Sequence, residues 1–146
     1  MQGGSAPAAL FEYLPLRRGG LGGQPQGSAG QRIGRAIAVA MDLSDEDSIR
    51  QLVATATDHF GGVRILHNNA ADMRTAHLDN DVAIEFMEAD LWDSIFRANT
   101  RGTMLATKYA LPALLASGDG SIINTSSGAS LTGDLYRPAY GASKAA

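Results

Sequence analysis

Blocks of apolar residues predict three strands, each followed by a helix, between residue 36 and residue 146. Short apolar runs at 36–41, 63–66 and 121–125 are typical of buried strands. Apolar residues then recur every three or four positions, as on one face of a helix, from 49 to 60 and from 90 to 117. A third helix begins near Tyr140. This order predicts an α/β fold with a parallel sheet.

Capping and turn residues set the limits of the predicted helices. Ser44 and Asp47 have the spacing of a capping box at the start of the first helix. Gly61-Gly62 ends that helix, and 71–88 is expected to be mostly loop. The helix over 90–117 contains Pro112, and its predicted buried face consists of Leu91, Ile95, Ala98, Gly102, Leu105 and Tyr109.

Residues 1–35 differ from the rest of the chain. Paired glycines and several prolines interrupt them, and only 8–16 is apolar enough to pack. We expect a poorly ordered or irregular segment here, without strands. The chain is therefore divided into this segment and an α/β domain over 36–146.

Composition excludes several kinds of function. The net charge of −3 favours neither nucleic acid nor an anionic membrane surface as a partner. The absence of cysteine excludes disulfides, thiolate metal sites and cysteine nucleophiles. His59, His67 and His77 are spaced too widely for a helical metal pair, so we expect no metal. No apolar run approaches the roughly 20 residues of a membrane span, and we expect a cytoplasmic protein.

The pair Tyr140 and Lys144 is the most informative candidate for chemistry. The two residues stand at i and i+4 and share one face of a helix. A lysine ammonium beside a tyrosine hydroxyl favours the phenolate, which makes Tyr140 a candidate acid/base near neutral pH. Asp42, Asn68 and Ser127 lie at or just beyond the carboxyl ends of predicted strands, where parallel sheets bind ligands. These residues are therefore expected to share one site.

Residues 36–146 resemble the short-chain dehydrogenase/reductase family of nicotinamide-dependent oxidoreductases. Tyr140-x-x-x-Lys144 is similar to the active-site signature of the family, and Ser127 stands thirteen residues earlier, where the family has its catalytic serine. Asn99 falls at the fourth catalytic position of the family. The resemblance implies a partial doubly wound sheet of the Rossmann type and hydride transfer between nicotinamide and an alcohol or ketone.

The resemblance also implies roles for these four residues. Tyr140 would give or take the proton of the substrate oxygen, and Ser127 would orient that oxygen. Lys144 would favour the phenolate and bind the nicotinamide ribose. Asn99 would hold a water that links Lys144 to solvent. Family members commonly assemble through the helix corresponding to 90–117, so a homo-oligomer is expected there.

A cofactor site for NAD or NADP is implied in the same way, and the sequence does not distinguish the two. Asn68-Asn69-Ala70 is similar to the Asn-Asn-Ala-Gly motif of the family, with Ala71 in place of the glycine. Asp42 matches the aspartate that contacts adenine. Together with Tyr140 and Lys144, the implied cofactor contacts are Asp42, Leu43, Asn68, Asn69 and Ala70.

The first βαβ unit of the family, with its glycine-rich pyrophosphate turn, is not legible before residue 36, and the C-terminal elements are absent. Residues 33–38 are interpreted either as the tail of the glycine motif running into a helix or as the entry to the strand at 36–41. We therefore expect a fragment that is inactive by itself. The alternative is a non-catalytic remnant that binds nucleotide weakly or pairs with an intact homologue.

Overall fold

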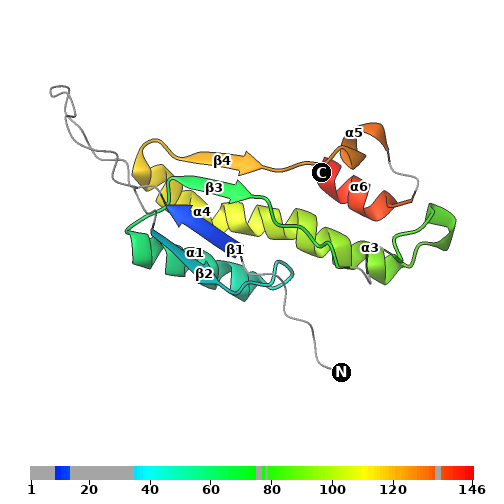
Figure 1. The fold of residues 1–146 in the computed structure, drawn as a ribbon, viewed down its shortest axis with the longest axis horizontal. Coiled ribbons are helices and arrows are strands. Elements are labelled where there is room, and N and C mark those ends of the chain that lie inside the picture. The colour runs from blue at the N-terminus through cyan, green and yellow to red at the C-terminus, as the bar shows by residue number, and fades with distance from the viewer. Residues whose placement is uncertain (1–8, 14–34, 75–76, 78, 134–135) are drawn as a thin grey trace, which may run out of the picture.

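The structure is a computed structural model that describes residues 9–13, 35–74, 77, 79–133 and 136–146. In chain order, its elements are β1 (Ala9–Tyr13), β2 (Arg35–Val39), α1 (Glu46–Phe60), β3 (Ile65–Asn68), the 3-10 helix η1 (Ile84–Phe86), α3 (Ala89–Phe96), the π-helix η2 (Arg97–Arg101), α4 (Gly102–Ser117), β4 (Ser121–Asn124), α5 (Ala129–Thr132) and α6 (Pro138–Ala145) (Figure 1). Helices and strands alternate from α1 onward, as the sequence predicts.

Strands β3 and β4 form a parallel pair. Their register runs from Ile65 opposite Ser121 to Asn68 opposite Asn124. Parallel neighbours need a long crossover, and here α3, η2 and α4 supply it. The prediction of an α/β fold with parallel strands is confirmed.

Strand β2 differs from its prediction in its partner. It pairs with β1 in antiparallel register, from Ala9 opposite Val39 to Tyr13 opposite Arg35, and β3 pairs instead with β4. Two expectations were therefore wrong: that no strand precedes residue 36, and that the strand at 36–41 joins the parallel sheet. Strand pairing is a long-range choice of the backbone, and apolar runs reveal strands without revealing their neighbours.

The position of β2 bears on the two interpretations of residues 33–38. Arg35–Val39 is a strand rather than the start of a helix. This favours the interpretation of residues 33–38 as the entry to a strand over their interpretation as the tail of the glycine motif. Most of the segment 1–35, for which poor order was predicted, lies outside the described residues.

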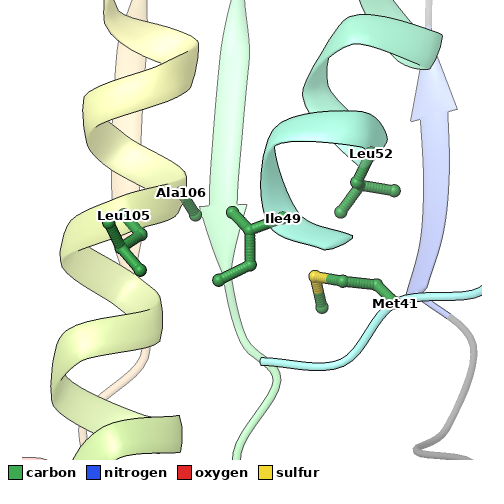
Figure 2. Packing of buried hydrophobic residues seen from close by; sticks show 5 residues of the cluster. All are labelled: Met41, Ile49, Leu52, Leu105 and Ala106. Atoms are coloured by element: carbon green, nitrogen blue, oxygen red, sulfur yellow. The ribbon is translucent and has the colours of Figure 1, made fainter. Parts of the chain in front are cut away.

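The core lies between α1 and α4. Figure 2 shows Ile49 of α1 on the side of Leu105 and Ala106 of α4, with Leu52 and Met41 next to one another beyond it. Full burial of a side chain such as Ile49 contributes roughly 1.5–3 kcal/mol. A second buried cluster contains Leu66 of β3 together with residues of both helices, namely Val53, Ala110 and Leu114. Both helices therefore pack against the same strand.

Helix α1 begins with a different cap from the one predicted. Asp45 is the N-cap residue, and its carboxylate accepts a hydrogen bond from the Asp47 N–H at 2.9 Å. The capping box proposed for Ser44 was wrong because the Ser44 hydroxyl donates to Asp42 instead. The helix ends as predicted at Gly61, whose φ of 80° is readily adopted only by glycine.

The helix predicted over 90–117 is continuous from Ala89 to Ser117 but contains a π-helical segment, η2. The Gly102 N–H bonds to the Arg97 carbonyl, five residues back, so the segment holds an extra residue in its turn. Figure 1 shows α3, η2 and α4 as one long rod. The predicted buried face is present, with Ile95, Ala98 and Leu105 in the interior.

The strands are less buried than predicted. Strand β3 begins two residues later than the predicted run over 63–66, and of its residues Leu66 is buried. All four residues of β4 are exposed. The physical reason is that α4 packs against the strand pair, while β4 pairs with β3 alone within the described part.

Candidate active site

Tyr140 and Lys144 lie on α6, at the C-terminal end of the described chain. Pro138 occupies the first turn of this helix, where its missing N–H costs nothing. Tyr140 and Lys144 are both half-buried. Burial lowers the pKa of the Lys144 ammonium below its ordinary value, because a charged group is less stable away from water.

The first turn of α6 is capped by a residue from a distant loop. Asp81 accepts a hydrogen bond from the Ala139 N–H at 3.0 Å and another from the Tyr140 N–H at 2.8 Å, one to each carboxylate oxygen. The sequence analysis did not single out Asp81. Asp81 and Ala139 are 58 positions apart in the chain, so no local pattern signals this contact.

Asn99 lies in η2 and connects α6 to the loop after β3. Its side-chain oxygen accepts from the Asp72 N–H at 2.7 Å, and its amide nitrogen donates to the Ser143 hydroxyl at 2.9 Å. The Ser143 hydroxyl in turn donates to the Tyr140 carbonyl at 2.8 Å. The structure thus joins Asn99 to the backbone of Tyr140 through Ser143.

Ser127 lies between β4 and α5, and its hydroxyl accepts from the Ala129 N–H at 3.3 Å. Its neighbour Ser126 reaches α6, where it donates to the Lys144 carbonyl at 2.9 Å. Helices α5 and α6 are in contact (Figure 1). The segment carrying Ser127 is therefore connected to the helix of Tyr140 through Ser126, a residue that the sequence analysis did not identify.

A pocket of about 240 Å³ lies where the chain leaves β2 and β3. It is next to Asn99, because Asp72, which bonds to Asn99, lines it. Three residues of the predicted cofactor set, Asp42, Leu43 and Ala70, line it, whereas Asn68 and Asn69 do not. The other lining residues are Met41, Ser44, Ala71, Asp72, Met73, Arg74 and Ala98.

Asn68 is the last residue of β3, and its side-chain amide nitrogen and its carbonyl are hydrogen-bonded within the protein. Its amide nitrogen donates to Asn124 on β4 at 2.9 Å and to Thr107 on α4 at 3.3 Å. Its carbonyl accepts from the Thr125 N–H at 3.0 Å. Asn68 therefore holds the ends of β3 and β4 together against α4.

The Asp42 carboxylate is held in the pocket wall by Ser44. The Ser44 hydroxyl and the Ser44 N–H both donate to Oδ1, at 2.6 and 2.8 Å. The side-chain hydrogen bond from Ser44, followed by the backbone one, holds the pKa of Asp42 below its usual value. Asp42 is consequently an ionised acceptor at neutral pH.

Asp72, Arg74 and His77 form a charged cluster that the sequence analysis missed. The Asp72 side chain is only 3% exposed; it accepts from Arg74 at 2.5 and 2.9 Å and lies 2.7 Å from Nδ1 of His77. Burial raises the pKa of Asp72, but the hydrogen bonds from Arg74 outweigh burial and leave it below the ordinary value. The position of Asp72 directly after the motif at 68–71 is the one signal that could have pointed to it.

Two properties of the described residues concern metals and membranes. They contain no group of three or more histidine or acidic side chains placed to hold a metal ion. None of their helices is both long enough and apolar enough to cross a membrane.

The family model for short-chain dehydrogenases matches residues 24–146. The chain belongs to this family. The match includes the pocket, Asn99 and all of α6.

Relatives with known names support the assignment. A probable short-chain type dehydrogenase/reductase of Bradyrhizobium diazoefficiens is 42% identical over 71% of this chain and 36% of its own length. A trans-4-hydroxycyclohexanecarboxylate dehydrogenase of Sinomonas cyclohexanicum is 37% identical over 77% of this chain and 41% of its own. A 3-oxoacyl-acyl-carrier-protein reductase of Thermotoga maritima is 30% identical over 77% and 43%. The chain thus spans about two fifths of the length of these relatives.

A solved structure shares the fold. The crystal structure of an NAD+-bound xylitol dehydrogenase superposes with a TM-score of 0.65 at 24% identity. The superposition covers 73% of this chain and 39% of the xylitol dehydrogenase. The likeness shows that the described elements are arranged as in part of a Rossmann-type dehydrogenase.

Proposed function

We propose that this chain carries the proton-transfer part of an NAD(P)-dependent oxidoreductase that interconverts an alcohol and a ketone. The observation that supports this proposal most directly is the position of Asn99. Its side chain bonds to Asp72 in the pocket wall and to Ser143 on the helix of Tyr140 and Lys144. A nucleotide bound in the pocket and a proton donor on α6 would then be held in a fixed position relative to one another. Membership of the family and the names of its relatives support the same reaction class.

The residues of the pocket suit the adenosine end of a dinucleotide. Within the described residues, both hydrogen bonds from Ser44 end on Oδ1 of Asp42, which leaves Oδ2 for an amine donor. The volume of about 240 Å³ is below the roughly 300–1,000 Å³ of a pocket for a whole drug-sized ligand, so it suits one end of a long cofactor. We assign Asp42, Leu43 and Ala70, which line the pocket, to this end, together with Asn69, which stands directly before Ala70 in the chain.

Asn68 has a different role in the proposal. Because its amide nitrogen bonds to Asn124 and Thr107 and its carbonyl to Thr125, Asn68 fixes the strand ends from which Asn69 and Ala70 extend. Tyr140 and Lys144 serve the nicotinamide end. NAD and NADP are equally compatible with these assignments.

A bound nicotinamide dinucleotide supplies or accepts the hydride. Tyr140 takes the proton of the substrate oxygen during oxidation and returns it during reduction, while Ser127 hydrogen-bonds the same oxygen and orients it. The half-buried Lys144 ammonium stabilises negative charge on the phenol oxygen more strongly than an exposed lysine would.

The contacts of Asn99 refine the proposed water relay. Its side-chain oxygen and nitrogen are already paired with Asp72 and Ser143. Its carbonyl oxygen has two lone pairs, and the Thr103 hydroxyl donates to it at 2.7 Å. We therefore assign the relay water to the carbonyl of Asn99 rather than to its amide.

The proposal is tested with cofactor titration and a Tyr140→Phe variant. Trp92 is the one tryptophan of the sequence, and energy transfer from it to reduced NAD or NADP reports binding. We expect saturable binding in wild type and variant. A fragment is expected to have little activity by itself, and any carbonyl reduction that the wild-type chain shows should be about 10²–10⁴-fold slower in the variant, which lacks the proton donor. Tyr136→Phe, at an exposed tyrosine, is the matched control and should keep full activity.

Three results would contradict the proposal: no saturable binding of either dinucleotide, unchanged turnover in Tyr140→Phe, or equal loss in Tyr136→Phe. Binding without turnover of any ketone or alcohol would instead support a non-catalytic chain that binds nucleotide. The exposure of Ile122 and Ile123 on β4 favours the other form of that alternative, a remnant that pairs with an intact homologue, because exposed apolar strands are found where another chain pairs.

We also propose that copies of the chain associate through the helix over 90–117. The apolar residues Met104, Leu111 and Leu115 on α4 are 51%, 43% and 72% exposed. Apolar side chains that cluster on a surface mark interaction sites more often than isolated ones do.

The expected cytoplasmic location stays a prediction.

A further inference from the structure

Asp81 is one of the most deeply buried side chains of the described chain, at 1% exposure. Both of its carboxylate oxygens are used, one by the Ala139 N–H and the other by the Tyr140 N–H. The two donors are consecutive residues in the first turn of α6. A buried carboxylate therefore holds the N-terminus of the helix that carries Tyr140 and Lys144.

This helix lacks the usual local cap. Its N-cap residue, Arg137, makes no side-chain capping hydrogen bond. The first N–H groups of a helix have no partner within the helix, and a carboxylate placed there also interacts favourably with the helix dipole. Asp81 supplies from a distant loop what the neighbouring sequence does not provide.

The length of α6 makes this contact consequential. The helix has eight residues, and isolated helices shorter than about 12 residues are marginal in water. Its orientation is therefore set by tertiary contacts. At Tyr140, Asp81 holds the N–H from a distant loop. Ser143 of the same helix, which itself accepts from Asn99, holds the carbonyl.

We propose that Asp81 is a positioning residue for Tyr140 and Lys144. This inference rests on the proposed function, in which Tyr140 transfers a proton and Lys144 assists it. By anchoring the Tyr140 N–H, Asp81 fixes the point from which the phenol ring leaves the helix. The loop that ends at Asp81 also contains Asp72, whose N–H holds Asn99, so one segment supports both sides of the site.

The test compares Asp81→Asn with Asp79→Asn in the full chain. Asparagine keeps the shape of the side chain but replaces one acceptor oxygen by an NH₂ group, which leaves a first-turn N–H without a partner. Asp79 is an exposed aspartate two residues away in the same loop and serves as the matched control.

The readouts are amide hydrogen exchange at Ala139 and Tyr140 and the ring ¹³Cζ signal of Tyr140, assigned with Tyr140→Phe. We expect exchange at both amides to rise at least about tenfold in Asp81→Asn, because hydrogen bonds to a charged group are lost. The Tyr140 ring signal should move, whereas amides of the core helix around Leu52 and the ring signal of Tyr109 should not. Asp79→Asn should leave all of these signals unchanged.

Unchanged exchange and an unmoved Tyr140 signal in Asp81→Asn would overturn the inference, as would equal changes in Asp79→Asn. If Asp81→Asn does not fold, the wild-type chain decides: amides of Ala139 and Tyr140 that exchange as fast as unbonded amides would overturn it. None of these readouts needs cofactor. A Tyr140-dependent turnover with unmoved NMR signals therefore refutes only the role of Asp81, whereas absent cofactor binding refutes the proposed function itself.

Discussion

At Asp72, burial and ion pairing act in opposite directions on one carboxyl group. Burial alone raises the pKa of Asp72, yet the hydrogen bonds from Arg74 and the charge of His77 bring it below the ordinary 3.8. The backbone N–H of the same residue holds the side chain of Asn99. Asp72 thus links the charge balance of the pocket wall to the placement of a proposed catalytic residue.

This arrangement predicts how stability depends on pH. A carboxyl whose pKa is lower in the folded than in the unfolded chain stabilises the fold above its ordinary pKa of 3.8, and that contribution is lost as the pH falls below it. We expect Asp72→Asn to lose about 1–2 kcal/mol of unfolding free energy at pH 7. As the pH falls below 3.8, the difference between variant and wild type should shrink.

Urea unfolding at several pH values measures this difference. Asp58→Asn, at an exposed aspartate of α1, is the control and should change stability little at any pH. A wild-type chain and an Asp72→Asn variant with parallel pH profiles would contradict the expected contribution.

Several site residues could be predicted one at a time, and others could not. Tyr140, Lys144 and Asn99 stand at spacings that a single sequence displays, and the structure places them on α6 and η2, which share the Ser143 contact. Asp72 and Asp81 have no such spacing. They act through partners 27 and 58 residues away, so only the folded chain reveals them.

At the scale of elements, the junction of η2 and α4 controls how closely the long helix approaches the pocket. Gly102 begins α4, and a Cβ atom there would lie 2.6 Å from the Leu43 carbonyl oxygen. Leu43 lines the pocket. The absence of a side chain at residue 102 therefore allows the helix to pack directly against the pocket wall.

The variant Gly102→Ala tests this close approach. The added methyl group must displace backbone rather than a flexible side chain, which costs roughly 1–3 kcal/mol, partly offset by the higher helix propensity of alanine. We expect a net loss of about 1–2 kcal/mol in thermal or urea unfolding, together with weaker cofactor binding as Leu43 shifts.

Gly128→Ala is the matched control, because a Cβ atom at residue 128 has no neighbour within 4 Å and the φ of −55° suits alanine. Its stability should stay within about 0.5 kcal/mol of wild type. Equal stability of Gly102→Ala and Gly128→Ala would contradict the packing argument.

At the scale of the whole molecule, the described part leaves apolar residues on α4 and β4 at the surface. Leu115 on α4 is 72% exposed and Ile123 on β4 is 50% exposed. Such side chains are stabilised when a second surface covers them. The proposed association through the helix over 90–117 would cover the residues on α4.

Sedimentation of wild type and Leu115→Asp tests this association. We expect the wild-type mass to rise with concentration and the variant to associate at least about tenfold more weakly, because an unpaired charge is costly to bury. Leu131→Asp, at an 87% exposed leucine of α5, is the control and should associate as wild type does. A wild-type chain that stays monomeric at all concentrations, or equal weakening in both variants, would contradict the proposal.

The sequence by itself determined the kinds of element and much of their order. Apolar spacing predicted α1, the long helix and three strands, because the buried faces of helices and strands repeat with fixed periods along the chain. The spacing of Tyr140, Lys144, Ser127 and Asn99 carried the family, which the comparison over residues 24–146 then showed.

Only the tertiary structure decided which segments meet. Four features depend on contacts that the local spacing of apolar residues does not predict. They are the pairing of β2 with β1, the Asp45 cap, the π-helical turn at Asn99 and the hydrogen bonds from α6 to Asp81. Hydrogen bonds between distant segments form wherever the packed core brings donors and acceptors together. For that reason the Tyr140–Lys144 pair could be found in the sequence, whereas the residue that holds it in place could not.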